Sequence, residues 1–306
     1  MLSDDEFIKL VSSIGTENTA RRLGISSRNV RARSQRLRER GETVALPNRP
    51  YQSFPTRIPL TMSTGVVLVA SDCHYWPGHI TTAHRAFVRA CGKFKPSAII
   101  MNGDVFDGAS ISRHPPIGWS RCPTVLEEIE TCQDRLAEIV SACPAAKRFW
   151  AMGNHDIRFM SRLASHANEF QGVEGFDIQD HFPEWEHCVA VWINDDVVVK
   201  HRYRGGIHAT HNNTLNAGKT MVTGHLHSLK VTNFTDYRGT RYGVDTGTLM
   251  ANDGPQTAYT EDDPKNHRSG FAVLSFVDGE LMQPELVLVL DEEAGSVTFR
   301  GKKYIV

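Results

Sequence analysis

The sequence predicts an α/β protein, a two-sheet sandwich with βαβ units that is preceded by a small module of three helices. Between residues 66 and 168, three short apolar runs alternate with helical stretches, a pattern typical of βαβ units with buried parallel strands. After residue 190, strand-like runs follow one another with few helical intervals, which favours a second sheet packed on the first. The first 45 residues instead carry short helical patterns bounded by capping residues.

The composition of the 306-residue chain is that of an ordinary globular protein, with 40% hydrophobic residues and a net charge of −1. This length allows one sizeable core with a small module, or two medium domains. The N-terminus lacks a signal-peptide pattern, and no apolar stretch approaches the roughly 18 residues of a membrane span, so we expect a cytoplasmic protein without a membrane partner. The six cysteines form no C-x-x-C pair and are expected to be reduced thiols.

Residues 1–45 are predicted to form three short helices. Ser3 and Glu6 have the spacing of a capping box at the start of the first helix. Thr16 and Ser26 can cap the second and third helices, and Gly24 can end the second. The apolar residues expected to face inward are Phe7, Leu10, Val11, Ile14, Ala20, Leu23, Val30, Ala32 and Leu37.

The turn between the second and third of these helices resembles that of a helix-turn-helix. In the pattern A-x-x-LGIS-x-x-x-V, small Ala20 allows the helices to approach and Gly24 makes the turn. Ile25 and Val30 are expected to fill the space between the helices. The resemblance implies that residues 1–45 bind DNA.

The third predicted helix is rich in arginine. Between residues 21 and 40 there are eight arginines and a single acid, Glu39. In a recognition helix, residues near the start reach base edges and later arginines reach phosphates. The alternatives are a solvated arginine helix and a module that mediates oligomerisation; the sequence does not determine the oligomeric state. The predicted DNA-binding residues are Ser27, Arg28, Arg31, Arg33 and Arg36.

Residues 46–64 are predicted to be a proline-rich linker or a strap on the next domain. They hold four prolines and show no helical period. The predicted organisation is therefore a module at 1–45, a linker at 46–64 and a larger domain at 65–306.

Potential metal ligands follow five successive apolar runs, at the strand ends where α/β proteins place their ligand sites. The last run continues into VTGHLHS at residues 222–228. In an extended strand, His225 and His227 would share one face while Leu226 packs inward. The polar residues at the five ends are Asp72 and His74; Asp104 and Asp107; Asn154, His155 and Asp156; His201; and His225 and His227.

The order of these motifs resembles the calcineurin-like metallophosphoesterases, a family that includes phage-type enzymes and DNA-repair nucleases. The motifs D-x-H, G-D-x-x-D, G-N-H-D, a lone histidine and G-H-x-H occur here between residues 66 and 250. The resemblance implies the two-sheet fold and two divalent metal ions. Mn is the favoured metal, with Fe, Zn or Ni as alternatives, because mixed oxygen and imidazole ligands suit these metals better than Ca.

The resemblance also implies a role for each residue of the motifs. Asp104 would bridge the two ions and offset their mutual repulsion. His155 would be the acid that protonates the leaving oxygen, and Asp107 would orient its ring. One ion would be held by Asp72, His74 and His227, and the other by Asn154, His201 and His225.

Some assignments have competitors in the sequence. His208 and His211 compete for the lone-histidine position, for which His201 is preferred because it directly follows the run VVVK. Cys73, inside the D-x-H motif, is expected to pack rather than react. The candidates for contacts with substrate phosphate are Arg113, His114 and Arg158.

The function that these features favour is a two-metal phosphodiesterase or nuclease that acts on DNA through its N-terminal module. One alternative is a small-molecule phosphodiesterase, for example of cyclic nucleotides, or a protein phosphatase. A second alternative is a DNA-binding regulator whose phosphoesterase domain is inactive. The complete ligand set argues against inactivity, because a redundant site would be expected to lack at least one ligand.

Overall fold

The computed structural model describes the chain except for residues 1, 45–53, 115–120, 262 and 264. The chain divides into two compact units, Met1–Ser53 and Phe54–Val306. Within the described residues, no helix is both apolar enough and long enough to cross a membrane.

The N-terminal unit consists of α1 (Asp4–Leu23) and α2 (Ser27–Glu39). Gly15 interrupts α1 with a φ of 77°, so that three helical segments result, as the sequence predicts. Ser3 and Glu6 form the predicted capping box. Gly24 ends α1 in the left-handed conformation, and the side chain of Ser26 caps α2 by accepting a hydrogen bond from the Asn29 N–H.

The core of this unit is small, and two predictions about it are wrong. Ile25 is 41% exposed instead of lying between the helices, and Ala32 is exposed. Ser34 is buried in place of Ala32 because a helix with 3.6 residues per turn aligns positions 30, 34 and 37 on one face. The apolar residues buried together are Phe7, Val11, Ala20, Val30, Leu37 and Val44.

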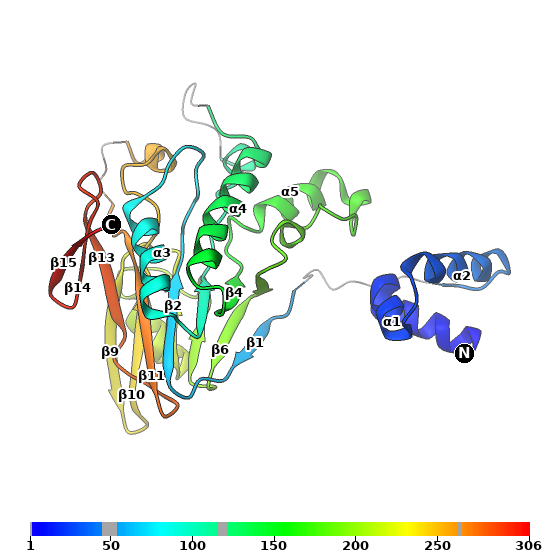
Figure 1. Ribbon diagram of the computed structural model, residues 1–306, viewed down its shortest axis with the longest axis horizontal. Helices are drawn as coiled ribbons and strands as arrows, with labels where there is room; N and C mark the ends of the chain where they lie inside the picture. Colours follow the sequence, from blue (N-terminus) through cyan, green and yellow to red (C-terminus); the bar gives the residue numbers. More distant parts are fainter. Residues whose placement is uncertain (1, 45–53, 115–120, 262, 264) are drawn as a thin grey trace. The chain divides into compact units, whose positions relative to one another are not determined.

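The second unit contains the predicted two sheets, which confirms the α/β class (Figure 1). Within the described residues, the first sheet has the order β1 (Arg57–Leu60), β6 (Ala190–Ile193), β7 (Val197–Val199), β8 (Thr220–Thr223), β10 (Gly239–Asp245) and β9 (Lys230–Asp236). The second has the order β15 (Lys302–Ile305), β14 (Ser296–Phe299), β13 (Glu285–Asp291), β11 (Gly270–Val277), β2 (Gly65–Ala70), β3 (Ala98–Met101), β4 (Lys147–Ala151) and β5 (Glu186–Cys188), with β12 (Glu280–Leu281) paired to β11.

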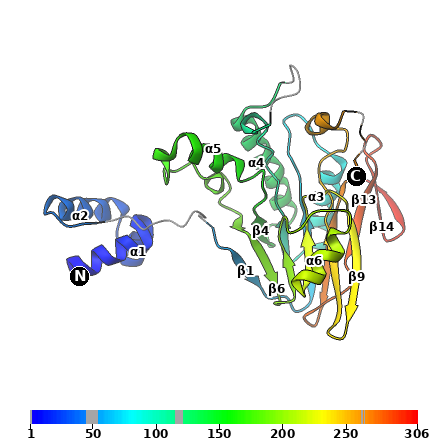
Figure 2. The ribbon, with the colours of Figure 1, turned by 180° about the vertical axis from the view of Figure 1, so that it is seen from behind.

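Helices cover the outer faces of both sheets. The strands β2, β3, β4 and β5 pair in parallel, as the predicted βαβ units require. α6 packs on β8, β9 and β10 (Figure 2). The helices of this unit are α3 (Thr82–Phe94), α4 (Val125–Ala142), α5 (Arg158–His166) and α6 (Ala209–Ala217), with short 3₁₀ turns η1 (Ala109–Ile111), η2 (Asn168–Phe170), η3 (Ile178–His181) and η4 (Pro255–Thr260).

The strand order differs from the expectation in two respects. The strands after residue 190 do not all belong to one sheet. β11 pairs with β2, so that β11, β13, β14 and β15 join the sheet that contains the strands of the βαβ units. In addition, Arg57–Leu60, predicted as linker, is the edge strand β1, paired in parallel with β6. Pro59 is compatible with this edge position because an edge strand leaves some N–H groups unpaired. Residues 45–53 of the predicted linker lie outside the described residues.

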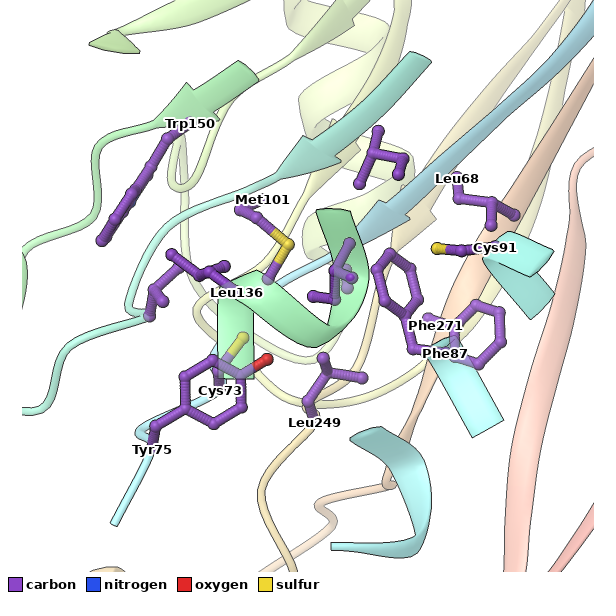
Figure 3. Close-up of a cluster of buried hydrophobic side chains, with 14 of the residues drawn as sticks. Leu68, Cys73, Tyr75, Phe87, Cys91, Met101, Leu136, Trp150, Leu249 and Phe271 are labelled. Carbon is purple, nitrogen blue, oxygen red and sulfur yellow. The ribbon is translucent and has the colours of Figure 1, made fainter. Parts of the chain in front are cut away.

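The strand β2 explains why its sequence is apolar throughout. Leu68 and Ala70 face a core shared with α3 and α4, whereas Val67 and Val69 face the other sheet. Figure 3 shows the first of these cores, in which Cys73 and Cys91 pack among aromatic and aliphatic side chains. All six cysteines are free, in agreement with the prediction. A strand buried on both faces needs no polar alternation.

Candidate metal centre

The predicted ligands come together at the carboxyl ends of strands from both sheets. Asp72, Asp104 and Asn154 follow β2, β3 and β4, whereas His201 and the pair His225 and His227 follow β7 and β8. Two contacts join the sheets across the site. His227 Nε2 lies 2.9 Å from Asp72 Oδ1, and His201 Nε2 lies 3.1 Å from Asp104 Oδ2.

Among the described residues, three groups of three side chains have the geometry of metal ligands. The first consists of the buried residues Asp72, His74 and His227, and the second of Asp104, His201 and the exposed His225. A third group, His74, Asp104 and His155, shares one residue with each of the other two, and in every group one potential ligand atom per residue lies within 4.8 Å of the others. The first two groups match the ligand sets that the sequence resemblance implies for two ions, and Asn154 directly precedes His155, whose N–H donates to Asp104.

The structure brings His201, and neither of its two competitors, to this site. His201 is 2% exposed and faces Asp104. His208 is exposed at the N-cap of α6, and the ring of His211 lies against that of Phe234, with 5.5 Å between centroids.

The expectation that His225 and His227 share a face of a strand is wrong. β8 ends at Thr223, and both histidines have positive φ angles, 71° and 54°. The His225 N–H donates to Asp72 Oδ2 at 2.8 Å, which holds the chain in this turn. As a result the two rings diverge, and His225 lies against His201 while His227 lies near His74.

Positive φ is common among the predicted ligands. Left-handed backbone is unfavourable for residues with a side chain and occurs mainly where the surrounding structure imposes it. The ligands with this conformation are Asp72 (52°), His74 (41°), Asp104 (52°), His225 (71°) and His227 (54°).

Glycines next to the ligands are required by close packing. A Cβ atom on Gly153 would collide with the Asp104 carboxylate, and one on Gly224 would collide with the side chains of Asp72 and Ser71. The glycines of the G-N-H-D and G-H-x-H motifs therefore let the backbone come directly against the ligand carboxylates.

Charges inside the site stabilise one another. Burial alone would raise the pKa of Asp72, but His227 and His201 hold that pKa below its ordinary value. The pKa of Asp104 is also lowered, against the effect of burial, by His201 in particular. Burial alone would lower the pKa of His201, but Asp104 and Asp72 raise it to about 10. The buried carboxylates thus favour a positive charge between them and the histidines.

The donor atoms of the site fit metal ions. His201 Nδ1 lies 2.8 Å from the carbonyl oxygen of Asn102, an acceptor, so Nδ1 carries the hydrogen. In the neutral ring, Nε2 then points a lone pair at Asp104 Oδ2, an arrangement that requires a proton or a cation between the two atoms. Asn154 Oδ1, His201 Nε2 and His227 Nδ1 are buried without a hydrogen-bond partner in the described residues. Such orphaned oxygen and imidazole atoms match the ligand preferences of divalent transition metals.

Asp107 contacts two histidines at once. Its Oδ1 lies 2.7 Å from His74 Nδ1 and 3.0 Å from His155 Nδ1. Burial would raise the pKa of Asp107, but these two contacts lower it well below its ordinary value. Conversely, burial would lower the pKa of His155, but the contact with Asp107 and the charge of Asp104 raise it. One carboxylate therefore orients a predicted metal ligand and the predicted acid together.

Of the three candidates for phosphate contacts, the structure brings only Arg158 to the site among the described contacts. Its Nη1 donates to the Asp107 carbonyl oxygen at 2.9 Å, and its Nη2 lies 3.0 Å from His155 Nε2. Arg113 and His114 are exposed, next to residues 115–120, which lie outside the described part of the chain.

The sequence did not predict the part that Asp156 plays. This fully buried carboxylate accepts hydrogen bonds from the N–H groups of Asp104, Val105, Phe106 and Gly153, and from Trp150 Nε1, at 2.7–3.1 Å. Burial and the charge of Asp104 raise its pKa. Asp156 thereby fixes the loop that carries Asp104 and Asp107. Its only signal in the sequence is its place as the last residue of G-N-H-D.

Two further residues around His227 were also missed. Asp245 is buried and accepts from the Ser228 N–H and Oγ–H and from the Gly247 N–H, which holds the end of the histidine loop. Burial raises the pKa of Asp245 to about 6. His267, which belongs to none of the motifs, stacks edge-on against His227 with 4.6 Å between ring centroids.

In the N-terminal unit, the predicted DNA-binding residues fall into two sets. Arg28, Arg31 and Arg36 are exposed, and Ser27 is half-buried at the start of α2. Arg33 differs from the prediction. Its guanidinium donates to the Leu2 carbonyl at 2.8 Å and to Asp4 Oδ1 at 2.7 Å, and lies over the ring of Phe7. Arg33 thus joins α2 to α1, and its donors are already engaged inside the module.

Comparison with known proteins gives a family model and several solved structures. The family model described as calcineurin-like phosphoesterase matches residues 65–263. No curated protein matches the chain. Among solved structures, Vps29 of Chaetomium thermophilum is 11% identical (78% of this chain and 96% of that chain covered, TM-score 0.39). A serine/threonine phosphatase of Saccharomyces cerevisiae is 13% identical (78% and 85%, TM-score 0.40), and the phosphoesterase Yfce of E. coli 14% (72% and 97%, TM-score 0.35).

Proposed function

The chain belongs to the calcineurin-like phosphoesterase family, and we propose that it is a metal-dependent phosphodiesterase that cleaves DNA held by its N-terminal module. Phosphoester hydrolysis follows from membership of the family. We propose in addition the substrate, the metal and the role of each residue.

The observation that supports hydrolysis of a phosphoester is the set of potential metal-ligand groups at this site. Asp72, His74 and His227 would hold one ion, and Asn154, His201 and His225 the other, with Asp104 between them. The mixed oxygen and imidazole donors favour Mn. Bound divalent ions would polarise the phosphoryl group and neutralise its charge.

The protein's own residues would handle the proton. The contact with Asp107 raises the pKa of His155, which favours the protonated ring, and we propose that this ring gives a proton from Nε2 to the leaving oxygen. Arg158 is always a donor, so its Nη2 cannot remain on Nε2 while that atom is protonated. The guanidinium would then turn to a phosphate oxygen of the substrate, which gives Arg158 a role in binding.

The DNA part of the proposal rests on the surface of α2. Arg28, Arg31 and Arg36 are exposed on a helix that follows a glycine turn, and α2 has no acid in its first turn. Arginine donors suit the phosphates and base edges of a duplex. The turn and the arginines together support a helix-turn-helix that tethers the enzyme to its substrate.

An activity screen of the full chain tests this proposal. Plasmid and oligonucleotide cleavage in Mn would be compared with hydrolysis of bis-p-nitrophenyl phosphate, a diester, and p-nitrophenyl phosphate, a monoester. We expect cleavage of DNA and of the small diester, and a gel shift at low salt that the double change Arg28→Ala and Arg31→Ala removes. DNA that is neither cut nor shifted, together with turnover of the small diester, would reject the DNA substrate.

A small-molecule diester is the second candidate substrate, because an open cavity of about 490 Å³ has in its lining one residue that contacts a predicted ligand. His267, which contacts His227, is in its lining together with Arg268 and Glu292. This volume is in the range of small-ligand sites. In the same screen, activity on cyclic or dinucleotide diesters without activity on DNA would favour this candidate.

A further inference from the structure

A basic loop connects the metal centre to α6. Residues 200–208, with the sequence KHRYRGGIH, begin directly after β7, include the predicted ligand His201 and end at the N-cap of α6. From residue 197 to residue 219 the chain contains no aspartate and no glutamate, whereas Lys200, Arg202 and Arg204 lie within the loop. The loop therefore presents positive charge beside a site that is expected to receive a phosphodiester.

The loop's backbone is held in place although residues 202–208 are exposed. Asn213, which is 1% exposed, accepts from the Arg204 N–H at 3.1 Å and donates to the Arg204 carbonyl at 3.4 Å. Lys230 Nζ donates to the Ile207 carbonyl at 2.7 Å, and the Gly224 N–H donates to the His201 carbonyl at 2.9 Å. Three anchors thus fix the loop to α6, to β9 and to the histidine loop.

The side chains that the loop displays combine an aromatic ring with cations. Tyr203 is 44% exposed, and Arg202 and Arg204 are exposed on either side of it in the chain. The Lys200 ammonium and the Arg204 guanidinium lie 5.3 and 5.8 Å from the centre of the Tyr203 ring, near the outer limit of about 6 Å for a cation–π contact. An exposed aromatic ring flanked by cations is the combination by which proteins hold single-stranded nucleic acid.

We propose that Tyr203 stacks on an unpaired nucleobase of the substrate while Arg202 and Arg204 contact the phosphates next to that base. This inference rests on the proposed function and adds the form of its substrate. A regular duplex keeps its bases stacked and offers Tyr203 no face. The strand at the metal centre is therefore single-stranded or frayed, whereas α2 binds a duplex part of the same DNA, as in a junction or at a DNA end.

Binding of a fluorescent 20-nucleotide strand and of the blunt duplex with the same sequence tests the proposal, measured by anisotropy with the full-length protein in EDTA. Changing Tyr203→Ala should weaken single-strand binding about tenfold and leave duplex binding within about twofold. Tyr203→Phe keeps the ring and should bind like the wild type. Tyr237→Ala is the matched control, because Tyr237 is fully exposed and next to an arginine but lies in the turn between β9 and β10.

A second variant tests the cations independently of the ring. The double change Arg202→Ala and Arg204→Ala should weaken single-strand binding. It should also lower the slope of log affinity against log salt concentration by the amount expected for about two phosphate contacts. Unlabelled mononucleotide and dinucleotide serve as competitors, because a base and a phosphate can come from a free nucleotide as well as from a strand. A mononucleotide that competes as well as the strand would overturn the assignment to nucleic acid, as would equal competition by an acidic peptide.

The outcomes separate this inference from the function on which it rests. If the wild type cuts DNA but Tyr203→Ala binds and cuts a single strand equally well, the loop assignment is wrong and the nuclease function stands. Equal losses on strand and duplex would reject the preference for an unpaired base. If the protein neither binds nor cuts any DNA, the nuclease function itself fails.

Discussion

The ligand site and the arginine surface of α2 both concentrate charge, but they are built in opposite ways. At the site, the carboxylates and the histidines His74, His201 and His227 are buried, and backbone N–H groups, glycines and neighbouring rings hold them in place. On α2, Arg28, Arg31 and Arg36 are exposed, and the inward face needs only Val30, Ser34 and Leu37. The chemistry of the site therefore depends on the fold, whereas the arginine surface can be altered without disturbing the fold that carries it.

The change Asp104→Asn should have the largest effect on activity. It removes the charge of the carboxylate that is proposed to bridge the two ions, while keeping the size of the side chain. We expect a loss of turnover on the order of 10³-fold or more in Mn, and weaker metal binding by isothermal titration calorimetry. Turnover within tenfold of the wild type would contradict a bridging role.

The change Asp156→Ala should cause the largest loss of stability. It leaves four backbone N–H groups and the Trp150 indole N–H without their acceptor in a buried place. We expect the free energy of unfolding to fall by about 3 kcal/mol or more in urea denaturation. The control is the exposed Asp236→Ala, which removes an ion pair with Arg241 and one hydrogen bond from the Arg238 N–H and should cost less than about 1 kcal/mol.

The stability of the second unit should also depend on pH in the acid range, because one of its buried histidines takes up a proton on unfolding. Burial lowers the pKa of His187, which packs on the Trp150 ring, to about 4. Between pH 6.5 and 4, His187 is protonated in the unfolded chain but stays neutral in the folded protein. Stability is therefore lost as the pH falls below 6.5. From pH 7 to 4.5, the non-titrating variant His187→Phe should lose about 2 kcal/mol less unfolding free energy than the wild type. Identical pH profiles in urea denaturation would contradict this pKa.

The smallest effects on stability should come from α2. Arg28→Ala with Arg36→Ala should change the free energy of unfolding by less than about 0.5 kcal/mol, yet lower the salt dependence of DNA binding by about one phosphate contact per arginine. Arg33→Ala is the contrasting variant, because it breaks the contacts with Leu2, Asp4 and Phe7. We expect it to destabilise the module by about 1 kcal/mol in thermal denaturation. A larger loss of stability in the double variant than in Arg33→Ala would contradict this difference between exposed and engaged arginines.

The polar residues at the strand ends could be predicted from the sequence, because an apolar strand run and the residue type that follows it are both local features. Apolar runs followed by Asp, Asn or His identified the side chains of the ligand groups, and the direct succession of VVVK and His201 selected, among three histidines, the one that lies against Asp104. The fold class follows from the same alternation of strands and helices. The caps at Ser3, Gly24 and Ser26 were likewise predictable from neighbouring residues.

The failures involve partners that are distant in the sequence. The turn at His225 is held by Asp72, 153 positions away, and Asp156 accepts from N–H groups about 50 positions earlier. β1 pairs with β6, whose residues lie more than a hundred positions further along the chain. No local pattern distinguishes such residues from an ordinary strand end, a turn acid or a proline-rich linker.

The left-handed backbone at five ligands has a consequence for how this protein can change. Each such residue costs roughly 1 kcal/mol relative to glycine, which adopts the conformation freely. Glycine at His225 would therefore relieve local strain while removing a donor from the site. The presence of Asp and His at these five positions is therefore explained by the ligand atoms that they offer to the site, and not by the stability of the fold.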